Sequence, residues 1–246
     1  MADIVLTGLA TSDPVPGEYV EVAFAQGPAS LATGTDKVLF MGGMLSSGVG
    51  SASVVYGPDS AVPMTSADDA ALLFGLGSEL HRQIKRFMET NKTTPVYAIA
   101  IAEGSSPSAA TGTITVATTA TGPGTLRIFI GDEFCDVGFT TGDTPTVIAA
   151  AAVVQINAKS HWPVTAANSA GVITITTKQK GLRANLTRYF ARMIPFTGSG
   201  STVTPVASTL VTGGTVSDDN TAALAVVVAQ KFYYIVPAAV DSTQLV

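Results

Sequence analysis

Chemically reactive side chains are scarce in this sequence. Its 246 residues include one cysteine, two histidines and one tryptophan. The single Cys135 excludes a disulfide framework and a thiolate metal cluster. We expect His81 on the solvated face of a helix beside Arg82, and His161 at a turn packed beside Trp162, so neither has the surroundings of a general base. No G-x-S-x-G or Walker A pattern occurs. The sequence therefore predicts no enzymatic activity and no cofactor.

Charged residues are also few. They make up 13% of the chain, against about a quarter in a typical protein, while the apolar share of 46% is ordinary. Thr, Ser, Ala and Gly fill the difference, as in a surface that neighbouring molecules cover. A net charge of only −5 and the apolar patterning argue against disorder. No apolar run reaches the length of a membrane span, and the start, Met1–Ile4, lacks the features of a secretion signal. We expect a protein that is made and kept soluble in a reducing cytoplasm.

The few charges are unevenly distributed. The residues before Lys37 include five acids and no base, and the stretch from Lys178 to Arg192 includes five bases and no acid. A basic stretch can bind phosphates, but the chain is acidic overall and interleaves only Tyr189 and Phe190 with these bases, so we expect no nucleic-acid partner. Attraction between the acidic segment and the basic stretch of a neighbouring copy explains the asymmetry at least as well.

The first 36 residues indicate an extended N-terminal arm. Prolines and glycines interrupt any helix there, and Val20–Phe24 is a short alternating piece typical of a strand. A lone strand is not stable, so this piece must pair with the sheet of its own chain or of another molecule. The candidate residues of an inter-subunit arm strand are Tyr19, Val20, Val22 and Phe24.

Residues 37–103 and 212–246 are expected to form one α/β core. Two helices should follow the caps Ser66 and Ser78, and Ser217 should cap a third, with Asp218 and Asp219 in its first turn. Gly48-Val49-Gly50 fails the dinucleotide-binding spacing, and the residues after it read as a strand. The predicted strands, in an order that favours a parallel sheet, are Val38–Met41, Ser53–Tyr56, Pro95–Ile101 and Phe232–Val236.

Residues 104–211 interrupt that core as a β-rich insertion. The pattern predicts a small α+β subdomain, with one helix, capped by Thr144, against a mostly antiparallel sheet. Asp132, Glu133 and Asp136 resemble part of a calcium loop, but a hairpin turn explains them better, and Cys135 reads as a small buried residue. The predicted strands are Thr113–Ala117, Leu126–Ile130, Phe134–Phe139, Val164–Ala167 and Val172–Thr176, with further extended pieces near Leu186–Ile194 and Thr202–Leu210. The fold class is thus a mixed α/β core sheet, an inserted β-rich subdomain and an N-terminal arm.

Nine short motifs spread over nearly the whole chain carry a resemblance to a known family. They are Val15–Glu21, Met64–Ala70, Leu73–Ser78, Pro95–Ile99, Gly142–Thr144, Ile156–Ala158, Pro163–Ala166, Val172–Thr176, and Gly213-Gly214 with Asp218. Together they resemble the contractile tail sheath proteins of Mu-like bacteriophages, although a glycine is missing before Asn185 where the family would have one. Family members continue past the position of Val246, so the resemblance is to the N-terminal portion of a sheath protein.

The resemblance implies a mechanical role in a virion tail assembled in the host bacterial cytoplasm. Sheath subunits form stacked hexameric rings around the tail tube, exchange terminal arms, and contract to drive the tube through the host envelope. The implied partners are copies of the same chain, the tail tube protein, the baseplate and the tail terminator. Two alternatives stay open. One is the sheath of a pyocin-like injection machine; the other is a carbohydrate-binding or adhesin-like module, for which Trp162 and Phe139 offer nearly all the expected aromatic surface.

Overall fold

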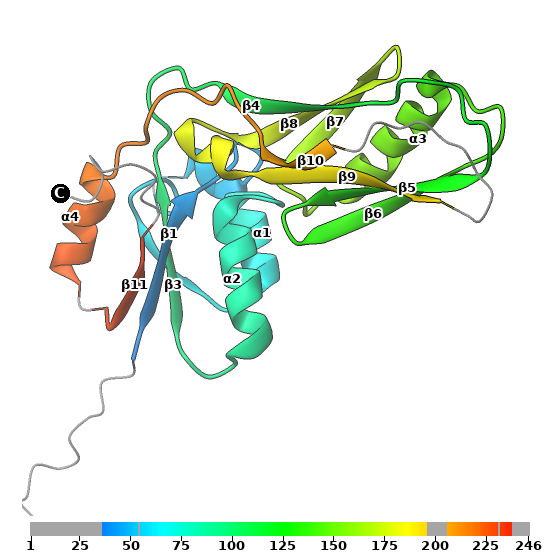
Figure 1. The fold of residues 1–246 in the computed structure, drawn as a ribbon. Coiled ribbons are helices and arrows are strands. Elements are labelled where there is room, and N and C mark those ends of the chain that lie inside the picture. The colour runs from blue at the N-terminus through cyan, green and yellow to red at the C-terminus, as the bar shows by residue number, and fades with distance from the viewer. Residues whose placement is uncertain (1–35, 54, 196–205, 231, 238–246) are drawn as a thin grey trace, which may run out of the picture. The chain divides into compact units, whose positions relative to one another are not determined.

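A computed structural model describes residues 36–53, 55–195, 206–230 and 232–237 (Figure 1). These residues belong to a single compact unit that spans Asp36–Val246. The candidate arm strand of Tyr19, Val20, Val22 and Phe24 lies outside the described residues, so it stays a prediction. No helix in the described ranges is both long and apolar enough to cross a membrane.

The core sheet has four strands in the order β11-β1-β3-β2. Strand β1 pairs in parallel with β3 and β11, whereas β2 runs antiparallel to β3, so the sheet is mixed. All six residues of β1 are buried, as its continuous apolar run predicts. The strands are β1 (Val38–Gly43), β2 (Ala61–Met64), β3 (Val96–Ile101) and β11 (Tyr234–Val236).

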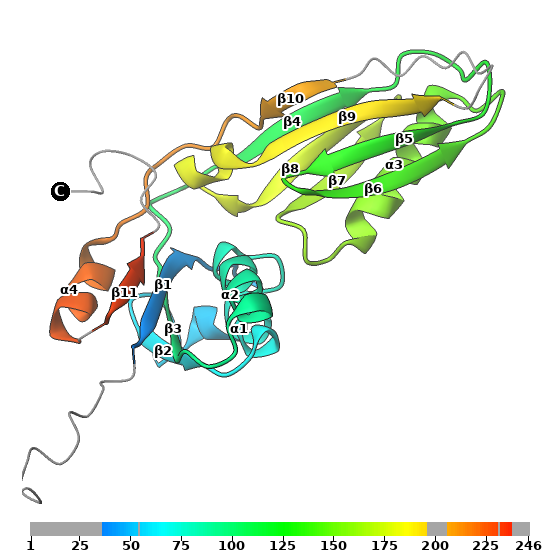
Figure 2. The same cartoon turned by 60° about the horizontal axis from the view of Figure 1, so that its bottom comes forward.

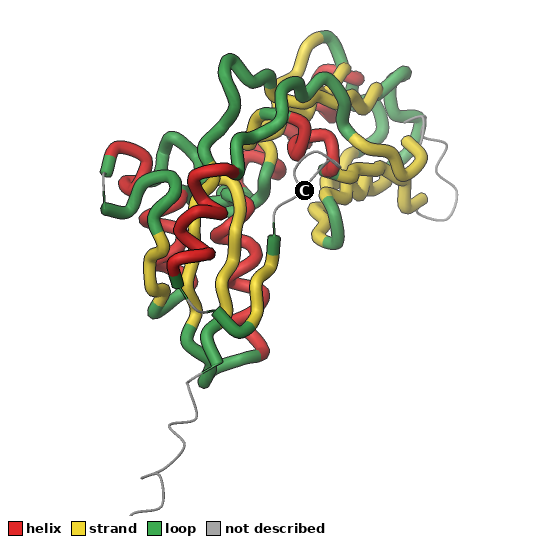
Figure 3. The backbone as a smooth tube through the Cα atoms, turned by 90° about the vertical axis from the view of Figure 1, so that its left-hand side faces the viewer, coloured by secondary structure: helices red, strands yellow, loops and turns green. Residues whose placement is uncertain are grey.

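Helices cover both faces of the core sheet. Val38 and Phe40 point to the face under α1 (Ala67–Phe74) and α2 (Glu79–Thr90), while Leu39 and Met41 point to the opposite face, where α4 (Thr221–Ala229) packs (Figure 3). This split follows from the alternation of side chains along a strand. The predicted caps of α1 and α2 are confirmed, because Ser66 Oγ accepts from the Asp69 N–H at 3.0 Å and Ser78 Oγ from the His81 N–H at 3.1 Å.

The strand predicted at Ser53–Tyr56 is wrong. A short 3₁₀ helix, η2 (Val49–Ala52), ends just before this segment, a turn includes Val55 and Tyr56, and the next strand in the chain begins at Ala61. The Ser53 hydroxyl accepts hydrogen bonds from the backbone N–H groups of Val55 and Tyr56, each at 3.2 Å. Such local bonds give the backbone an alternative to a sheet ladder, and apolar pattern alone does not reveal them.

The β-rich region, from β4 to β10, contains two antiparallel sheets where one was predicted (Figure 2). Their strand orders are β10-β9-β5-β6 and β4-β8-β7, and helix α3 contacts β6, β7 and β8. Both sheets and α3 share one apolar core. The elements are β4 (Ala109–Thr115), β5 (Gly124–Ile130), β6 (Glu133–Phe139), α3 (Pro145–Ala158), β7 (Val164–Ser169), β8 (Val172–Lys180), η3 (Leu182–Leu186), β9 (Arg188–Pro195) and β10 (Val206–Leu210). Thr144 holds the predicted N-cap position of α3, but its hydroxyl makes no capping bond.

The two connections between the core sheet and the β-rich region lie side by side. Single antiparallel bridges join Ala102 to Asp219, Ser108 to Thr215, and Thr111 to Thr212. The chain therefore leaves the core sheet and returns to it along one paired path.

The predicted start of the helix after residue 217 is also wrong. Helix α4 begins at Thr221 with Asn220 as N-cap, and its first turn holds no acid. Asp219 instead accepts from the Thr221 N–H at 2.9 Å just before the helix, and Asp218 is buried. Asp218 and Asp219, which were predicted in the first turn of a helix, therefore belong to the connection that precedes α4.

Candidate functional site

Three segments distant in sequence meet at a buried arginine. The Arg183 guanidinium, from η3, pairs with Glu79 at the first turn of α2 and with Asp218 in the connection to α4. Glu79 Oε2 also accepts from the Gly43 N–H at the end of β1, at 3.0 Å. We call Arg183, Glu79 and Asp218 the Arg183 network. It ties the β-rich region to the core sheet.

Burial sets the electrostatics of the Arg183 network. Arg183 and Asp218 are both buried. Burial raises the pKa of the Asp218 carboxyl above its ordinary value, even though Arg183 acts in the opposite direction. Burial also disfavours the charged Arg183, but Glu79 and Asp218 outweigh it, so the arginine pKa is raised and its charge is retained. Loss of one partner would leave an uncompensated charge in a site with little water.

Close backbone packing surrounds the same site. An ideal Cβ added to Gly43 would lie 2.1 Å from Nε2 of Gln179, a buried side chain on β8. The Gln179 amide in turn donates to the Met44 carbonyl at 3.4 Å. Because Gly43 has no side chain, the Gln179 side chain of β8 can pack directly against the end of β1.

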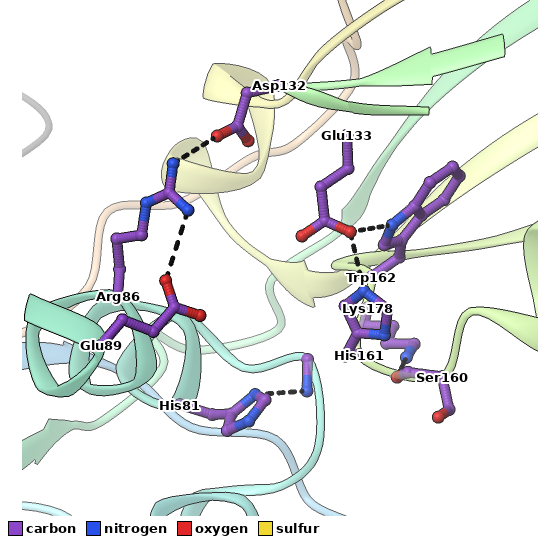
Figure 4. A network of polar contacts seen from close by, with 10 residues as sticks. His81, Arg86, Glu89, Asp132, Glu133, Ser160, His161, Trp162 and Lys178 are labelled. Atoms are coloured by element: carbon purple, nitrogen blue, oxygen red, sulfur yellow. Dashed lines mark hydrogen bonds and ion pairs between the residues drawn. The ribbon is translucent and has the colours of Figure 1, made fainter. Parts of the chain in front are cut away.

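A second set of polar contacts lies around α2 and the β5–β6 turn (Figure 4). Glu133 Oε2 accepts from Trp162 Nε1 at 2.7 Å and lies 2.7 Å from His161 Nε2. Burial raises the pKa of Glu133, but the hydrogen bonds from His161 and Trp162 outweigh burial and lower the pKa overall. Nearby, the exposed Arg86 on α2 pairs with Asp132 at 3.2 Å.

The solvated position predicted for His81 is wrong. His81 is buried, and its Nδ1 accepts from the Gly77 N–H at 3.2 Å. Burial lowers the pKa of His81, and the positive Lys85 lowers it further. Because the ring bonds to the turn before α2, it fixes that turn and is not available as a surface base.

Each acidic side chain of the β5–β6 hairpin has its own hydrogen-bonding or ion-pair partner. Asp136 holds Arg127 in a bidentate pair with both distances at 2.6 Å, and Glu133 and Asp132 have the partners named above. Among the described residues no three His, Cys, Asp or Glu side chains gather as metal ligands. Gly131 and Asp132 form a turn, as predicted. The predicted burial of Cys135 is confirmed, and burial raises its thiol pKa to about 11.

The aromatic surface of the β-rich region differs from the prediction. Trp162 and Phe139 are buried, at 1% and 5% exposure. Three other rings lie on the face of the β5–β6–β9 sheet that points away from the common core: Phe129, Phe134 and Phe190. Alternation of side chains along β5, β6 and β9 puts these rings on one face, but the apolar neighbours Ile128, Ile130 and Ala191 left no sequence signal for which face is outward.

These three rings form a stacked group edged by arginines. Phe129 stacks on Phe190 with centroids 4.0 Å apart and contacts Phe134 at 5.6 Å. Arg127 lies over Phe134 at 4.1 Å and Arg192 over Phe129 at 5.4 Å. We call Phe129, Phe134, Phe190, Arg127 and Arg192 the phenylalanine platform.

A second exposed apolar surface belongs to α4 and β11. Val228 is 88% exposed and Tyr233 70% exposed, and all three residues of β11 are exposed. Strand β11 is an edge of the core sheet. Large exposed apolar patches mark interaction surfaces, and the α4–β11 surface is of this kind.

The charged side chains of the Arg183 network and of the β5–β6 hairpin bind one another or nearby polar groups. No family model matches the chain. It is 31% identical over 171 residues to the Mu-like prophage FluMu tail sheath protein of Haemophilus influenzae. The chain is thus a homologue of a Mu-like prophage tail sheath protein over this segment.

The matched segment covers 70% of this chain and 34% of that relative, so the chain spans about a third of the relative's length. Among solved structures, the flagellar cap protein FliD of Escherichia coli aligns with a TM-score of 0.28 and 16% identity, over 47% of this chain and 37% of that one. A TM-score and an identity this low support neither a shared fold nor a shared function.

Proposed function

We propose that the chain is the structural subunit of a contractile phage tail sheath. In this role it polymerises as stacked hexameric rings around the tail tube and contracts to drive the tube through the host envelope. The observation that carries the proposal is the 31% identity to a Mu-like prophage tail sheath protein over 70% of this chain. Its location would be the virion tail, and its partners would be copies of itself, the tube, the baseplate and the tail terminator.

The distribution of charge and apolar surface supports the proposal. A subunit that works by assembly needs exposed apolar surface, which the α4–β11 surface provides and to which Phe134 of the phenylalanine platform adds. Contraction requires subunit interfaces with two packings, joined by tethers that persist in both. The domain division predicted from the sequence, with arm 1–36, core 37–103 plus 212–246, and insertion 104–211, supplies a tether, an assembly core and an outward-facing decoration.

Immunogold electron microscopy of induced tail particles tests this role. Antibodies against the chain should label contractile tails along their whole length between the head and the baseplate. Label confined to fibres or tail tips would contradict the sheath proposal and support an adhesin. A particle without a head but with the same labelled tail would identify a pyocin-like machine.

A carbohydrate-binding module remains the second candidate, because the exposed Phe134 and the half-buried Phe129 and Phe190 gather on one sheet face and provide part of the apolar stacking surface that such a module needs. Against it, Asp136 already pairs with the Arg127 of that surface, and phenylalanine adds no hydrogen bond for a sugar hydroxyl. Glycan-array binding that is lost in Phe134→Ala would support this candidate.

A further inference from the structure

A small cleft lies where α2 meets the β-rich region. Its volume is about 200 Å³, which is smaller than the roughly 300–1,000 Å³ of sites for cofactors and drug-sized molecules. A cleft of this size holds one or two side chains of a peptide. We call it the α2–β9 cleft, and the lining residues that matter here are Gly77, Glu79, Arg82, Gln179, Leu186 and Arg188.

The α2–β9 cleft has an excess of positive charge, although the chain as a whole carries −5. Its lining includes three arginines and a single acid, Glu79. Arg183 is neutralised within its buried network by Glu79 and Asp218. The excess therefore belongs to Arg82, on α2, and Arg188, at the start of β9.

Arg82 and Arg188 are exposed, and within the part of the chain that the structure describes neither forms an ion pair. Asp132 and Glu133, which share a neighbouring cleft with Arg82, already pair with Arg86 and His161. Two long guanidinium side chains are thus available to an anion, and guanidinium groups bind carboxylates through paired hydrogen bonds.

A buried acceptor in the same cleft lacks a donor. Gln179 is 8% exposed, and its Nε2 donates to the Met44 carbonyl at 3.4 Å. Its Oε1 is buried and has no hydrogen-bond partner among the described residues. A buried acceptor without a partner is costly, so the ligand that fits this cleft carries an N–H or O–H donor as well as a negative charge.

An acidic peptide combines these features. Its carboxylates match the two arginines, and a backbone N–H matches the Gln179 acceptor. Leu186, 62% exposed in the lining, offers an apolar contact that a peptide side chain uses and a free inorganic anion does not.

We propose that the α2–β9 cleft binds an acidic peptide segment of a partner protein. Arg82 and Arg188 hold its carboxylates, Gln179 accepts from its backbone, and Leu186 packs against an apolar neighbour. Since Arg82 belongs to the core and Arg188 to the β-rich region, the bound segment bridges the two. The proposal goes beyond the sheath role and does not depend on it.

Amide NMR titration of the full 246-residue chain tests the proposal. The probe is the capped peptide Leu-Asp-Asp, and the capped peptide Leu-Asn-Asn, which has the same shape without the charge, is its matched control. We expect saturable shift changes at Gly77, Gly131 and Thr187, which line the cleft, with Leu-Asp-Asp and not with Leu-Asn-Asn.

Charge reversal at either arginine should weaken this binding. Arg82→Glu and Arg188→Glu should each raise the Kd of Leu-Asp-Asp about tenfold, because each turns an attraction into a repulsion. Lys92→Glu, the same charge change at an exposed residue outside the cleft, should leave the Kd unchanged. Both arginines are exposed, so the variants should keep the melting temperature of the parent. Where one does not, the milder change to Gln at that position takes its place and should raise the Kd about threefold.

Shift changes confined to other elements, equal binding of Leu-Asn-Asn, or a Kd indifferent to both arginine variants would overturn the proposal. Inorganic phosphate that produces the same shifts at lower concentration than the peptide would also overturn it, because the cleft would then be a site for a free anion. None of these results bears on labelling of tails along their length, so the sheath role is judged separately.

Discussion

The core sheet and the β-rich region bury their apolar side chains in different ways. In the β-rich region two sheets and α3 enclose one continuous core, and Phe129, Phe134 and Phe190 lie together on the outer face of one sheet. The core sheet divides its apolar side chains between two faces, and the face under α4 has fewer buried apolar residues than the face under α1 and α2. It also ends in an edge strand, β11, with all three residues exposed. Among the described residues, the outward aromatic side chains of the β-rich region lie on a sheet face, whereas those of the core sheet lie on an edge strand.

The Arg183 network is the strongest test of how the two regions are joined. Arg183→Ala should lower the free energy of unfolding by about 3–5 kcal/mol, because Glu79 and Asp218 would lose their buried partner. Urea unfolding followed by circular dichroism measures the change. The exposed Arg82 on α2 offers the control, and Arg82→Ala should cost less than about 0.5 kcal/mol. A loss below about 1 kcal/mol for Arg183→Ala would mean that the network does not hold the regions together.

Substitutions at two glycines compare the tightly packed contact between β1 and β8, at Gly43, with the exposed face of β6, at Gly138. Gly43→Ala should cost about 1–3 kcal/mol, since its new methyl group would overlap the Gln179 amide. Gly138 lies on exposed β6 with nothing within 4 Å of an added Cβ, so Gly138→Ala should be neutral or stabilise by up to about 1 kcal/mol. Thermal unfolding of the two variants side by side gives the comparison. Equal effects would refute the idea that β8 and β1 are tightly packed at Gly43.

Titration of Glu133 should change the free energy of unfolding less than Arg183→Ala or Gly43→Ala does. Its folded-state pKa is lowered, so its contribution is fully present above its ordinary value of 4.5 and is lost as the pH falls through the lower folded value. Because the side chain is half exposed, the expected size is only about 0.5 kcal/mol. Stability curves between pH 3 and 6 for the parent and Glu133→Gln would show it as a shallower acid loss in the variant. A steeper acid loss in Glu133→Gln would have the wrong sign for this account.

Much of the fold follows from local sequence signals. The buried run at Val38, the serine caps before α1 and α2, and the alternation of β5 and β6 all predicted elements that the structure has. The predictions failed where a polar side chain makes a hydrogen bond that the apolar pattern does not reveal. The Ser53 hydroxyl stabilises a turn where a strand was predicted. Asp218 pairs with Arg183, 35 residues earlier, and lies before the helix in which it was predicted.

The candidate surfaces were harder to predict than the fold. Whether an aromatic ring is buried depends on which face of a strand meets the core, and the sequence does not state that choice. Trp162 is buried because its indole N–H reaches Glu133 across 29 residues, and Phe129 is outward because Ile128 and Ile130 point inward. Likewise, His81 is buried because the turn at Gly77 donates to its ring.

Electron microscopy of the protein expressed from its complete gene, together with its tail tube protein, tests the central claim most directly. The account predicts hollow sheathed tubes with six subunits in each ring, and six-fold symmetry in a helical reconstruction. Bare tubes beside monomeric protein, under conditions in which the chain is folded, would contradict the claim that this protein works by assembling with copies of itself.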